Sequence, residues 1–319
     1  MARATFNFGM MMSGRSVIGD TLHEIGKTDD RLWVLTPDIG GALKDFKADF
    51  GDRFIDVGIA EQNCVGVAAG LALEGKVPVV MGMIPFMTMR ACEQVRTAVC
   101  YQNLPVRIIG TGGGLTSGGG STHNAMEDVA IMRTLVNMTV ISIADPLMIR
   151  DILIQGMDYE GPMFIRLAQG KQDAVLYEPG TVEFKIGSSA IPVENGNDAV
   201  IFAHGEMVMQ SIEAADALKE EGINITVVDM YSIKPLDEAT ILAKTEECGG
   251  KVLVVEDHLM YGGLASAISD LYIDKGVAPK CFKRLGIPQV YAGFGSGPEQ
   301  RTKYGYDKDS TIAAIKAML

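Results

Sequence analysis

Short apolar runs alternate with longer stretches of helical spacing along this chain of 319 residues. The runs are rich in Val, Ile and Leu and have the length of buried strands. Six of them lie in the first half, at residues 32–35, 54–57, 77–81, 106–109, 139–143 and 163–167. Strands that alternate with helices form parallel sheets with helices on both faces. The sequence therefore predicts an α/β fold built from mostly parallel sheets.

The texture of the sequence changes between residues 169 and 197, where glycines and two prolines interrupt any helical period. Such a composition is typical of a connection between domains. A second alternation follows, with strands expected at residues 198–203, 224–229 and 251–256 and helices at 207–221, 237–247 and 263–272. We predict a first domain over residues 1–175, a linker over 176–196 and a second domain over 197–319.

The composition excludes several classes of protein. Asp and Glu number 40 against 28 Lys and Arg, and the formal net charge of -12 has the wrong sign for a nucleic-acid surface. The longest nearly apolar stretch, Val77–Met87, is about half as long as a bilayer span. The five cysteines show no C-x-x-C spacing, and the first residues do not resemble a signal peptide. We therefore expect a cytoplasmic protein without a membrane span.

The segment RFIDVGIAEQNCVGVAAGLAL, residues 53–73, is the most informative stretch of the chain. It places Glu61 between a strand that ends near Val57 and a helix that contains small residues such as Ala68 and Ala69. An acidic residue at the start of a helix is ordinarily a partner of the helix dipole. The residues around Glu61 favour a second interpretation.

The motif G-I-A-E-Q-N followed by V-G-V-A-A-G-L-A resembles the transketolase family. The resemblance continues through segments that cover nearly the whole chain, at residues 91–109, 120–133, 161–167, 229–237, 254–270 and 285–298. The chain is similar to the C-terminal subunit of a split transketolase. That resemblance implies a pyrimidine-binding domain followed by the transketolase C-terminal domain, and thiamine diphosphate as the coenzyme.

The resemblance also implies roles for the residues of the first domain. Thiamine diphosphate loses its C2 proton when a carboxyl group on the pyrimidine N1' pushes the ring toward its imino tautomer. Glu61 matches the glutamate with that role. Phe86 is expected to stack on the ring, with Met89 and Cys92 at helical spacing behind it and Ile59 beside Glu61 as further cofactor contacts. The alternative is that Phe86 is an ordinary core residue.

His123 lies in the motif G-G-G-S-T-H-N, which is similar to the family motif whose histidine contacts the donor carbonyl and moves protons. We predict that His123 is catalytic with Glu61 and binds substrate. His258, in E-D-H-L-M-Y-G-G, is assigned to packing between domains or subunits. Seven glycines between residues 110 and 120 lack the spacing of a phosphate-binding loop. They are expected to let the backbone approach the cofactor and the substrate.

The chain contains no G-D-G motif, which the family uses to hold the diphosphate through a metal ion. We therefore predict no metal ligand in this chain. Mg2+ and the diphosphate are expected to bind to a partner, an N-terminal transketolase subunit, in an α2β2 assembly. The active site would lie between the two kinds of chain.

Departures from the family pattern point to the substrate. Of the residues that bind sugar phosphates in relatives, Arg15 matches, whereas the other positions hold Ala42, Thr111 and Gln169. Gly119 stands where relatives place an Asp that binds a sugar hydroxyl. Each lost charge-assisted contact is worth about 1.5–3 kcal/mol when desolvated. We expect ordinary pentose phosphates to bind poorly and an atypical sugar, branched, sulfonated or unphosphorylated, to be the substrate.

Two alternatives remain open at the level of sequence. One is the β subunit of a 2-oxoacid dehydrogenase E1 component, which has the same two-domain layout but decarboxylates its substrate. The other is a non-catalytic assembly subunit that keeps the fold. The segments G-I-A-E-Q-N and T-H-N-A-M-E-D favour the transketolase, and Glu61 and His123 argue against an inert subunit.

Overall fold

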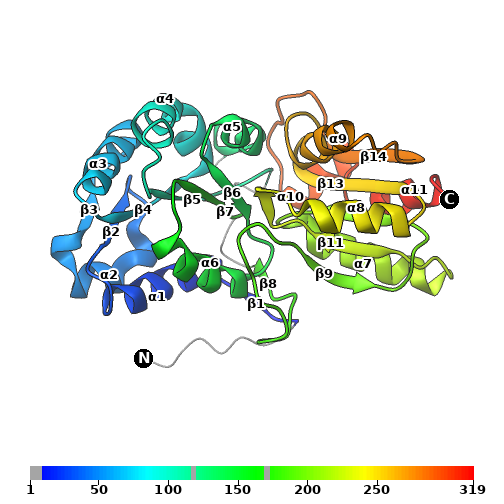
Figure 1. Ribbon diagram of the computed structural model, residues 1–319, viewed down its shortest axis with the longest axis horizontal. Helices are drawn as coiled ribbons and strands as arrows, with labels where there is room; N and C mark the ends of the chain where they lie inside the picture. Colours follow the sequence, from blue (N-terminus) through cyan, green and yellow to red (C-terminus); the bar gives the residue numbers. More distant parts are fainter. Residues whose placement is uncertain (1–8, 116–119, 169–172) are drawn as a thin grey trace.

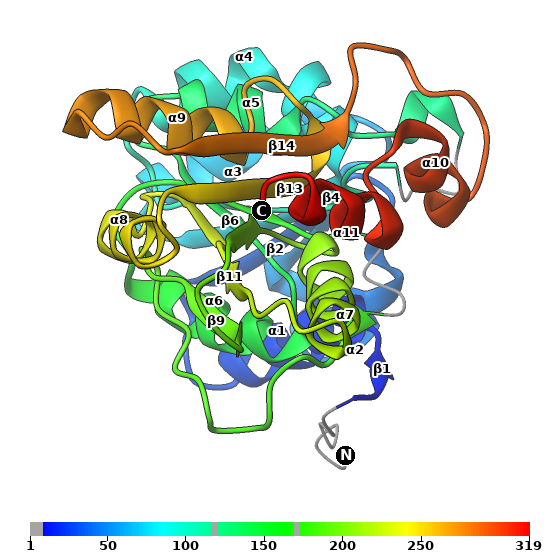
Figure 2. The same cartoon turned by 90° about the vertical axis from the view of Figure 1, so that its right-hand side faces the viewer.

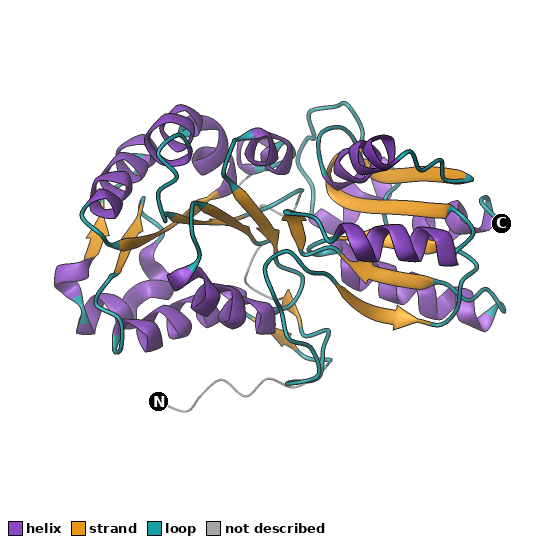
Figure 3. Cartoon of the chain, in the orientation of Figure 1, coloured by secondary structure: helices purple, strands orange, loops and turns teal. Residues whose placement is uncertain are grey.

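A seven-stranded sheet with helices on both faces dominates the first half of the molecule (Figures 1 and 3). The computed structural model of the protein describes residues 9–115, 120–168 and 173–319. In spatial order the strands are β12 (Ser232–Lys234), β6 (Thr139–Ser142), β7 (Met163–Arg166), β5 (Arg107–Thr111), β4 (Val77–Met83), β2 (Leu32–Thr36) and β3 (Phe54–Asp56). All neighbours are parallel except β12, which runs antiparallel to β6.

Helices cover both faces of this sheet. On one face lie α1 (Gly14–Gly26), α2 (Lys44–Asp49) and α6 (Pro146–Asp158), and on the other lie α3 (Glu61–Leu73), α4 (Cys92–Gln94) and α5 (Asp128–Thr134) (Figure 1). Short helical turns, η1 (Gly40–Leu43), η2 (Gly51–Arg53), η3 (Phe86–Arg90), η4 (Val95–Cys100) and η5 (Ser121–His123), complete the connections. The strands are buried on both sides, which explains why they appear in the sequence as continuous apolar runs.

A five-stranded sheet forms the second half. Its order is β14 (Cys281–Ile287), β13 (Lys251–Leu259), β10 (Val200–Ala203), β11 (Thr226–Asp229) and β9 (Ala190–Glu194), and only β9 is antiparallel among these. The helices are α7 (Met207–Glu220), α8 (Glu238–Glu247), α9 (Leu264–Lys275), α10 (Gly297–Tyr304) and α11 (Lys308–Lys316). Figure 2 shows α8 and α7 on opposite sides of β11. Two further short strands, β1 (Met11–Met12) and β8 (Asp173–Ala174), pair antiparallel.

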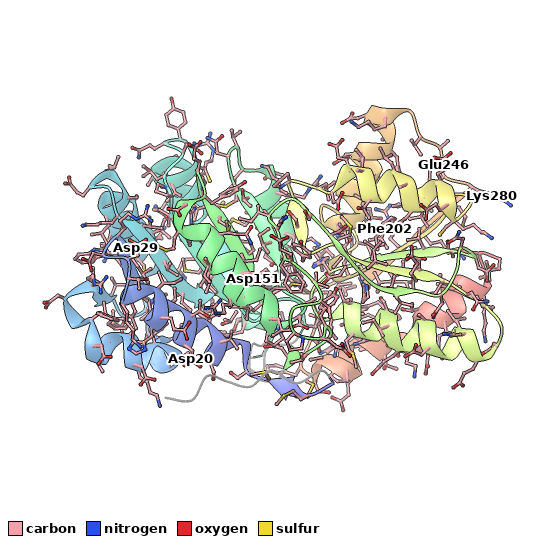
Figure 4. All side chains as sticks on the ribbon, turned by 60° about the horizontal axis from the view of Figure 1, so that its bottom comes forward. Asp20, Asp29, Asp151, Phe202, Glu246 and Lys280 are labelled. Atoms are coloured by element: carbon pink, nitrogen blue, oxygen red, sulfur yellow. The ribbon has the colours of Figure 1, made fainter. Side chains whose placement is uncertain are left out.

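The two halves share one hydrophobic core. A single cluster of buried side chains includes Val79 and Ile165 of the first sheet and Ile201 and Val227 of the second. In Figure 4 Phe202 lies inside the second half, whereas Lys280 lies at its outer end. Since the shared cluster includes side chains of both sheets, their packing helps to hold the two halves together.

The alternating pattern predicted the parallel strands well and the added strands poorly. The mostly parallel α/β architecture is confirmed. The residues expected to link the domains contain β9, and β12 crosses from the second half to the edge of the first sheet. β14 also lacked an apolar run, because most of its residues are only partly buried. Among the described residues, no helix combines the length and the apolar character needed to cross a bilayer.

Candidate active site

The residues predicted to carry chemistry gather at the carboxyl edge of the seven-stranded sheet. Glu61 follows β3, Phe86 follows β4, and Thr111 ends β5 ahead of the loop that carries His123. Arg15 lies in the first turn of α1, which leads into β2 and so begins at that same edge. In open α/β sheets this edge is where ligands bind.

Glu61 is the first residue of α3 and is 3% exposed. The helix buries Val65, Ala68 and Ala69, so its small side chains let it pack closely against the sheet. Ala60, at the N-cap, provides no side-chain hydrogen bond to the helix. The carboxylate of Glu61 instead accepts a hydrogen bond from Arg90, with 2.7 Å between Nη1 and Oε2.

Phe86 opens η3, a π-helical turn in which the N–H of Ala91 donates to the carbonyl oxygen of Phe86. The ordinary α-helical spacing expected for residues 86–92 is therefore wrong, because the wider turn changes which side chains share a face. The guanidinium carbon of Arg90 lies 4.3 Å from the centroid of the Phe86 ring. Arg90 thus contacts both the carboxylate and the aromatic ring of the site.

His123 joins this group from the other side. Its ring meets that of Phe86 edge-on, with 5.1 Å between the centroids and 79° between the planes. Its Nδ1 lies 3.0 Å from Oγ1 of Thr122. The structure therefore brings together Glu61, Phe86 and His123, and adds Arg90, which the sequence analysis missed. A single cation at the end of the apolar stretch from Val77 was the available signal.

The remaining residues predicted to contact the cofactor lie at the rim. Met89 is 45% exposed and Ile59 is 74% exposed, whereas Cys92 is partly buried. Large apolar side chains at a polar site are candidates for cover by another molecule. The chain by itself leaves this side of the site open to solvent.

Arg15 and Thr111, both predicted to bind substrate, are in direct contact. Nη2 of Arg15 donates to Oγ1 of the buried Thr111 at 3.1 Å. Burial lowers the pKa of Arg15, and the nearby charge of Asp173 opposes that shift. Two other residues predicted to bind substrate, Gln169 and Gly119, lie outside the described residues.

The glycines that begin the His123 loop approach other protein groups closely. A Cβ on Gly113 would lie 2.7 Å from the guanidinium carbon of Arg166, and one on Gly114 would lie 2.1 Å from the carboxyl group of Asp257. Oδ1 of Asp257 also accepts the N–H of Leu115 at 3.1 Å. At these positions the space is needed for packing between the two halves, which the sequence analysis did not foresee.

A buried polar network lies at this joint between the halves. Nε of Arg166 donates to Oδ2 of Asp128 at 2.6 Å, and both side chains are almost fully buried. Burial alone would lower the pKa of Arg166, but the charges of Asp128 and Asp257 raise it. The backbone N–H of Ala130 donates to Nε2 of His258 at 3.2 Å. His258 therefore connects the two halves, in agreement with its assignment to domain packing.

A second part of the network surrounds Glu256. Its carboxylate accepts the N–H groups of Leu264 and Ala265 at the start of α9, at 2.8 and 3.1 Å. Its pKa is lowered, although burial alone would raise it, because His204 and other neighbours favour the charged form. Burial, together with the charge of Arg166, lowers the pKa of His204.

The donor set at the sheet edge fits a flat nitrogen heterocycle. A buried carboxylate can bind a ring nitrogen, and an aromatic ring beside it can stack on the heterocycle. Within residues 9–115, 120–168 and 173–319, no group of three or more His, Cys, Asp or Glu side chains is placed to hold a metal ion.

Comparison with known proteins agrees with this geometry. Residues 10–172 match the model of the transketolase pyrimidine-binding domain, and residues 187–311 match that of the transketolase C-terminal domain. A protein of Methanocaldococcus jannaschii, provisionally named a transketolase C-terminal section, is 36% identical, with 96% of each chain covered.

Two further relatives are named for their substrates. One of the two chains of an apulose-4-phosphate transketolase from Phocaeicola vulgatus is 34% identical, with 94% of this chain and 95% of the relative covered. A 6-deoxy-6-sulfo-D-fructose transketolase subunit of a Clostridium species is 33% identical, with 94% and 92% covered. A solved structure described as a split gene transketolase, inactive beta4 tetramer, matches with a TM-score of 0.86 at 34% identity and covers 98% of each chain. The chain belongs to the transketolase family.

Proposed function

We propose that this chain is one subunit of a thiamine-diphosphate-dependent transketolase, which moves a two-carbon ketol unit from a ketose donor to an aldose acceptor. The observation that carries the proposal is the buried carboxylate of Glu61 next to Phe86 and His123 at the carboxyl edge of the sheet. Thiamine diphosphate, when bound, would supply the nucleophilic carbon for the transfer. Membership of the transketolase family supports this chemistry.

Glu61 would hold a proton between its carboxyl group and a ring nitrogen of the coenzyme. A carboxyl group at 3% exposure is shielded from water, so its hydrogen bond to the ring is not weakened by competition with solvent. Phe86 would orient the ring by stacking, and Met89 and Ile59 would form an apolar border. These roles assign one task to each side chain at the rim.

His123 would act on the substrate. Its imidazole can accept or donate a proton near neutral pH, and its loop position places it at the open side of the site. Contact with the Phe86 ring restricts the imidazole, so the proton transfer would occur from a fixed position. We propose that His123 moves a proton at the donor carbonyl and the neighbouring hydroxyl groups.

Arg15 and Thr111 would bind the distal end of the sugar. The hydrogen bond between them holds the guanidinium in place, and the charge of Asp173 partly offsets its positive charge. The relatives named for apulose 4-phosphate and sulfofructose support an atypical sugar as substrate. We propose a branched, sulfonated or unphosphorylated ketose as donor.

A second polypeptide would complete the site. The open rim at Ile59 and Met89 supports this, as do relatives that are named as subunits. We propose that an N-terminal transketolase subunit holds Mg2+ and the diphosphate, in an α2β2 complex. The complex would be produced by expressing this chain with the product of a neighbouring gene that carries a G-D-G motif.

The proposal is tested by steady-state kinetics of the complex with a series of ketose donors and an aldose acceptor. We expect kcat/KM with xylulose 5-phosphate to be at least about 100-fold below that of the preferred donor, since two polar contacts are missing. A value for xylulose 5-phosphate within about 10^4–10^8 M-1 s-1 would refute the atypical substrate. Release of CO2 from a 2-oxoacid would replace ketol transfer with decarboxylation.

A further inference from the structure

Arg90 makes two contacts in the site at the same time. Its Nη1 donates to Oε2 of Glu61 at 2.7 Å, and its guanidinium carbon lies 4.3 Å from the centroid of the Phe86 ring. These are a hydrogen bond to the carboxylate and a contact with the aromatic face. They are also the two contacts that the proposed function assigns to the aminopyrimidine ring of the coenzyme.

The chemistry of the guanidinium group explains why it can make both contacts. It is flat and cationic, it donates hydrogen bonds in its own plane, and it stacks on aromatic faces. An aminopyrimidine that is hydrogen-bonded to a carboxylate is also flat and also donates in its plane. Flat groups in contact lie about 3.5–4 Å apart. A guanidinium at 4.3 Å from the Phe86 centroid therefore leaves no room for a ring between them.

The surroundings of Arg90 allow its side chain to leave. It is 45% exposed, whereas the Glu61 side chain that it pairs with is 3% exposed. The neighbours Met87 and Ala91 are buried and hold the backbone of this segment in place. A rotation of the Arg90 side chain toward solvent would therefore uncover Glu61 and Phe86 without disturbing the core.

We infer that Arg90 occupies the place of the aminopyrimidine in the coenzyme-free subunit and that the coenzyme displaces it, an inference that rests on the proposed function. A buried carboxylate without a partner is unfavourable, so the arginine keeps Glu61 charged and ordered until the coenzyme arrives. The ion pair competes with the coenzyme for the same two side chains. Its presence weakens coenzyme binding by the factor with which the ion pair is favoured over the open site.

Calorimetric titration of thiamine diphosphate with Mg2+ into the coenzyme-free complex tests this competition. We expect Arg90→Met to bind the coenzyme about 10-fold more tightly than the unmodified complex, because the competing cation is absent. Arg90→Lys, which keeps the charge but not the flat group, should lie between them. Arg96→Met, a change of the same kind at an exposed position of η4, should leave the dissociation constant unchanged.

Each outcome of the titration has a distinct meaning. Weaker binding by Arg90→Met would show that Arg90 supports the coenzyme and would overturn the inference, as would unchanged binding. If Arg90→Met does not fold, as judged by its thermal unfolding, the comparison of Arg90→Lys with the unmodified complex decides by the same criterion. If the unmodified complex itself binds no thiamine diphosphate, the proposed function fails and the inference fails with it.

Discussion

The rim of the candidate active site and the joint between the two halves differ in how far this chain satisfies its own charged groups. At the joint, Arg166 and Asp128 are nearly fully buried and pair at 2.6 Å. At the rim, the buried Glu61 is paired with an arginine that is 45% exposed, next to the exposed Ile59. The joint is complete within one polypeptide, whereas the rim is open on one side.

This difference has a physical consequence. A buried ion pair that loses one partner leaves an uncompensated charge, so the joint tolerates little change. A pair with one half-exposed member can separate at low cost, so the rim can exchange its partner for a ligand. The molecule therefore combines a rigid frame with a site that is prepared for other molecules.

Replacement of Glu61 by Gln gives the largest effect on activity that we expect at the rim. The amide cannot exchange a proton with a ring nitrogen, so kcat of the complex should fall by about 10^2–10^4-fold. Steady-state kinetics with the preferred donor measures this change. Glu74→Gln, at the exposed end of the same helix, should leave kcat unchanged. Full activity of a Glu61→Gln complex would exclude Glu61 from the reaction.

Replacement of Asp128 by Asn tests the joint. The change leaves the buried Arg166 without its charge partner and should reduce the free energy of unfolding by about 3–5 kcal/mol. Asp158→Asn removes a partner of Arg31 at 82% exposure and should cost less than about 1 kcal/mol. Urea unfolding of the isolated chain measures both. Equal losses would mean that the joint is no more demanding than the surface.

Replacement of Phe86 by Leu sharpens the description of the rim. Loss of the stacking contact, worth about 0.5–1.5 kcal/mol, should weaken binding of the coenzyme to the complex by up to about 10-fold. Calorimetric titration measures the dissociation constant. The same substitution at Phe282, on β14 of the other half, serves as the control and should have no effect. Undiminished affinity in Phe86→Leu would place the coenzyme elsewhere.

The smallest effect concerns pH and the buried Asp229, whose Oδ2 accepts a hydrogen bond from the hydroxyl of Tyr177 at 3.0 Å. Burial raises the pKa of Asp229 well above its usual value. The folded chain therefore holds a proton that the unfolded chain releases above about pH 4, so this group's contribution to stability is lost as the pH rises toward the raised pKa. Asp229→Asn, which carries no ionisable group, should gain stability relative to the unmodified chain between pH 5 and pH 8 in urea unfolding. A difference in stability that stays constant over this pH range would contradict the prediction.

Much of the fold and part of the site could be predicted from the sequence. The parallel strands are buried on both faces and therefore stand out as apolar runs, whereas β12 has three residues and β14 is half exposed. Glu61 and His123 were found because their motifs are local in the sequence. The role of Arg90 was not, because its contacts with Glu61 lie 29 residues away and form only when two strand ends meet. Likewise, Asp257 reaches the His123 loop from a distant part of the chain.

The central claim is that this chain supplies only part of a coenzyme site. It is tested most directly by titrating thiamine diphosphate with Mg2+ into two samples, the isolated chain and its complex with the N-terminal subunit, and comparing the dissociation constants. The account predicts binding to the complex and at least about 100-fold weaker binding to the isolated chain, since contacts to the diphosphate would be missing. Equally tight binding by the isolated chain would contradict it.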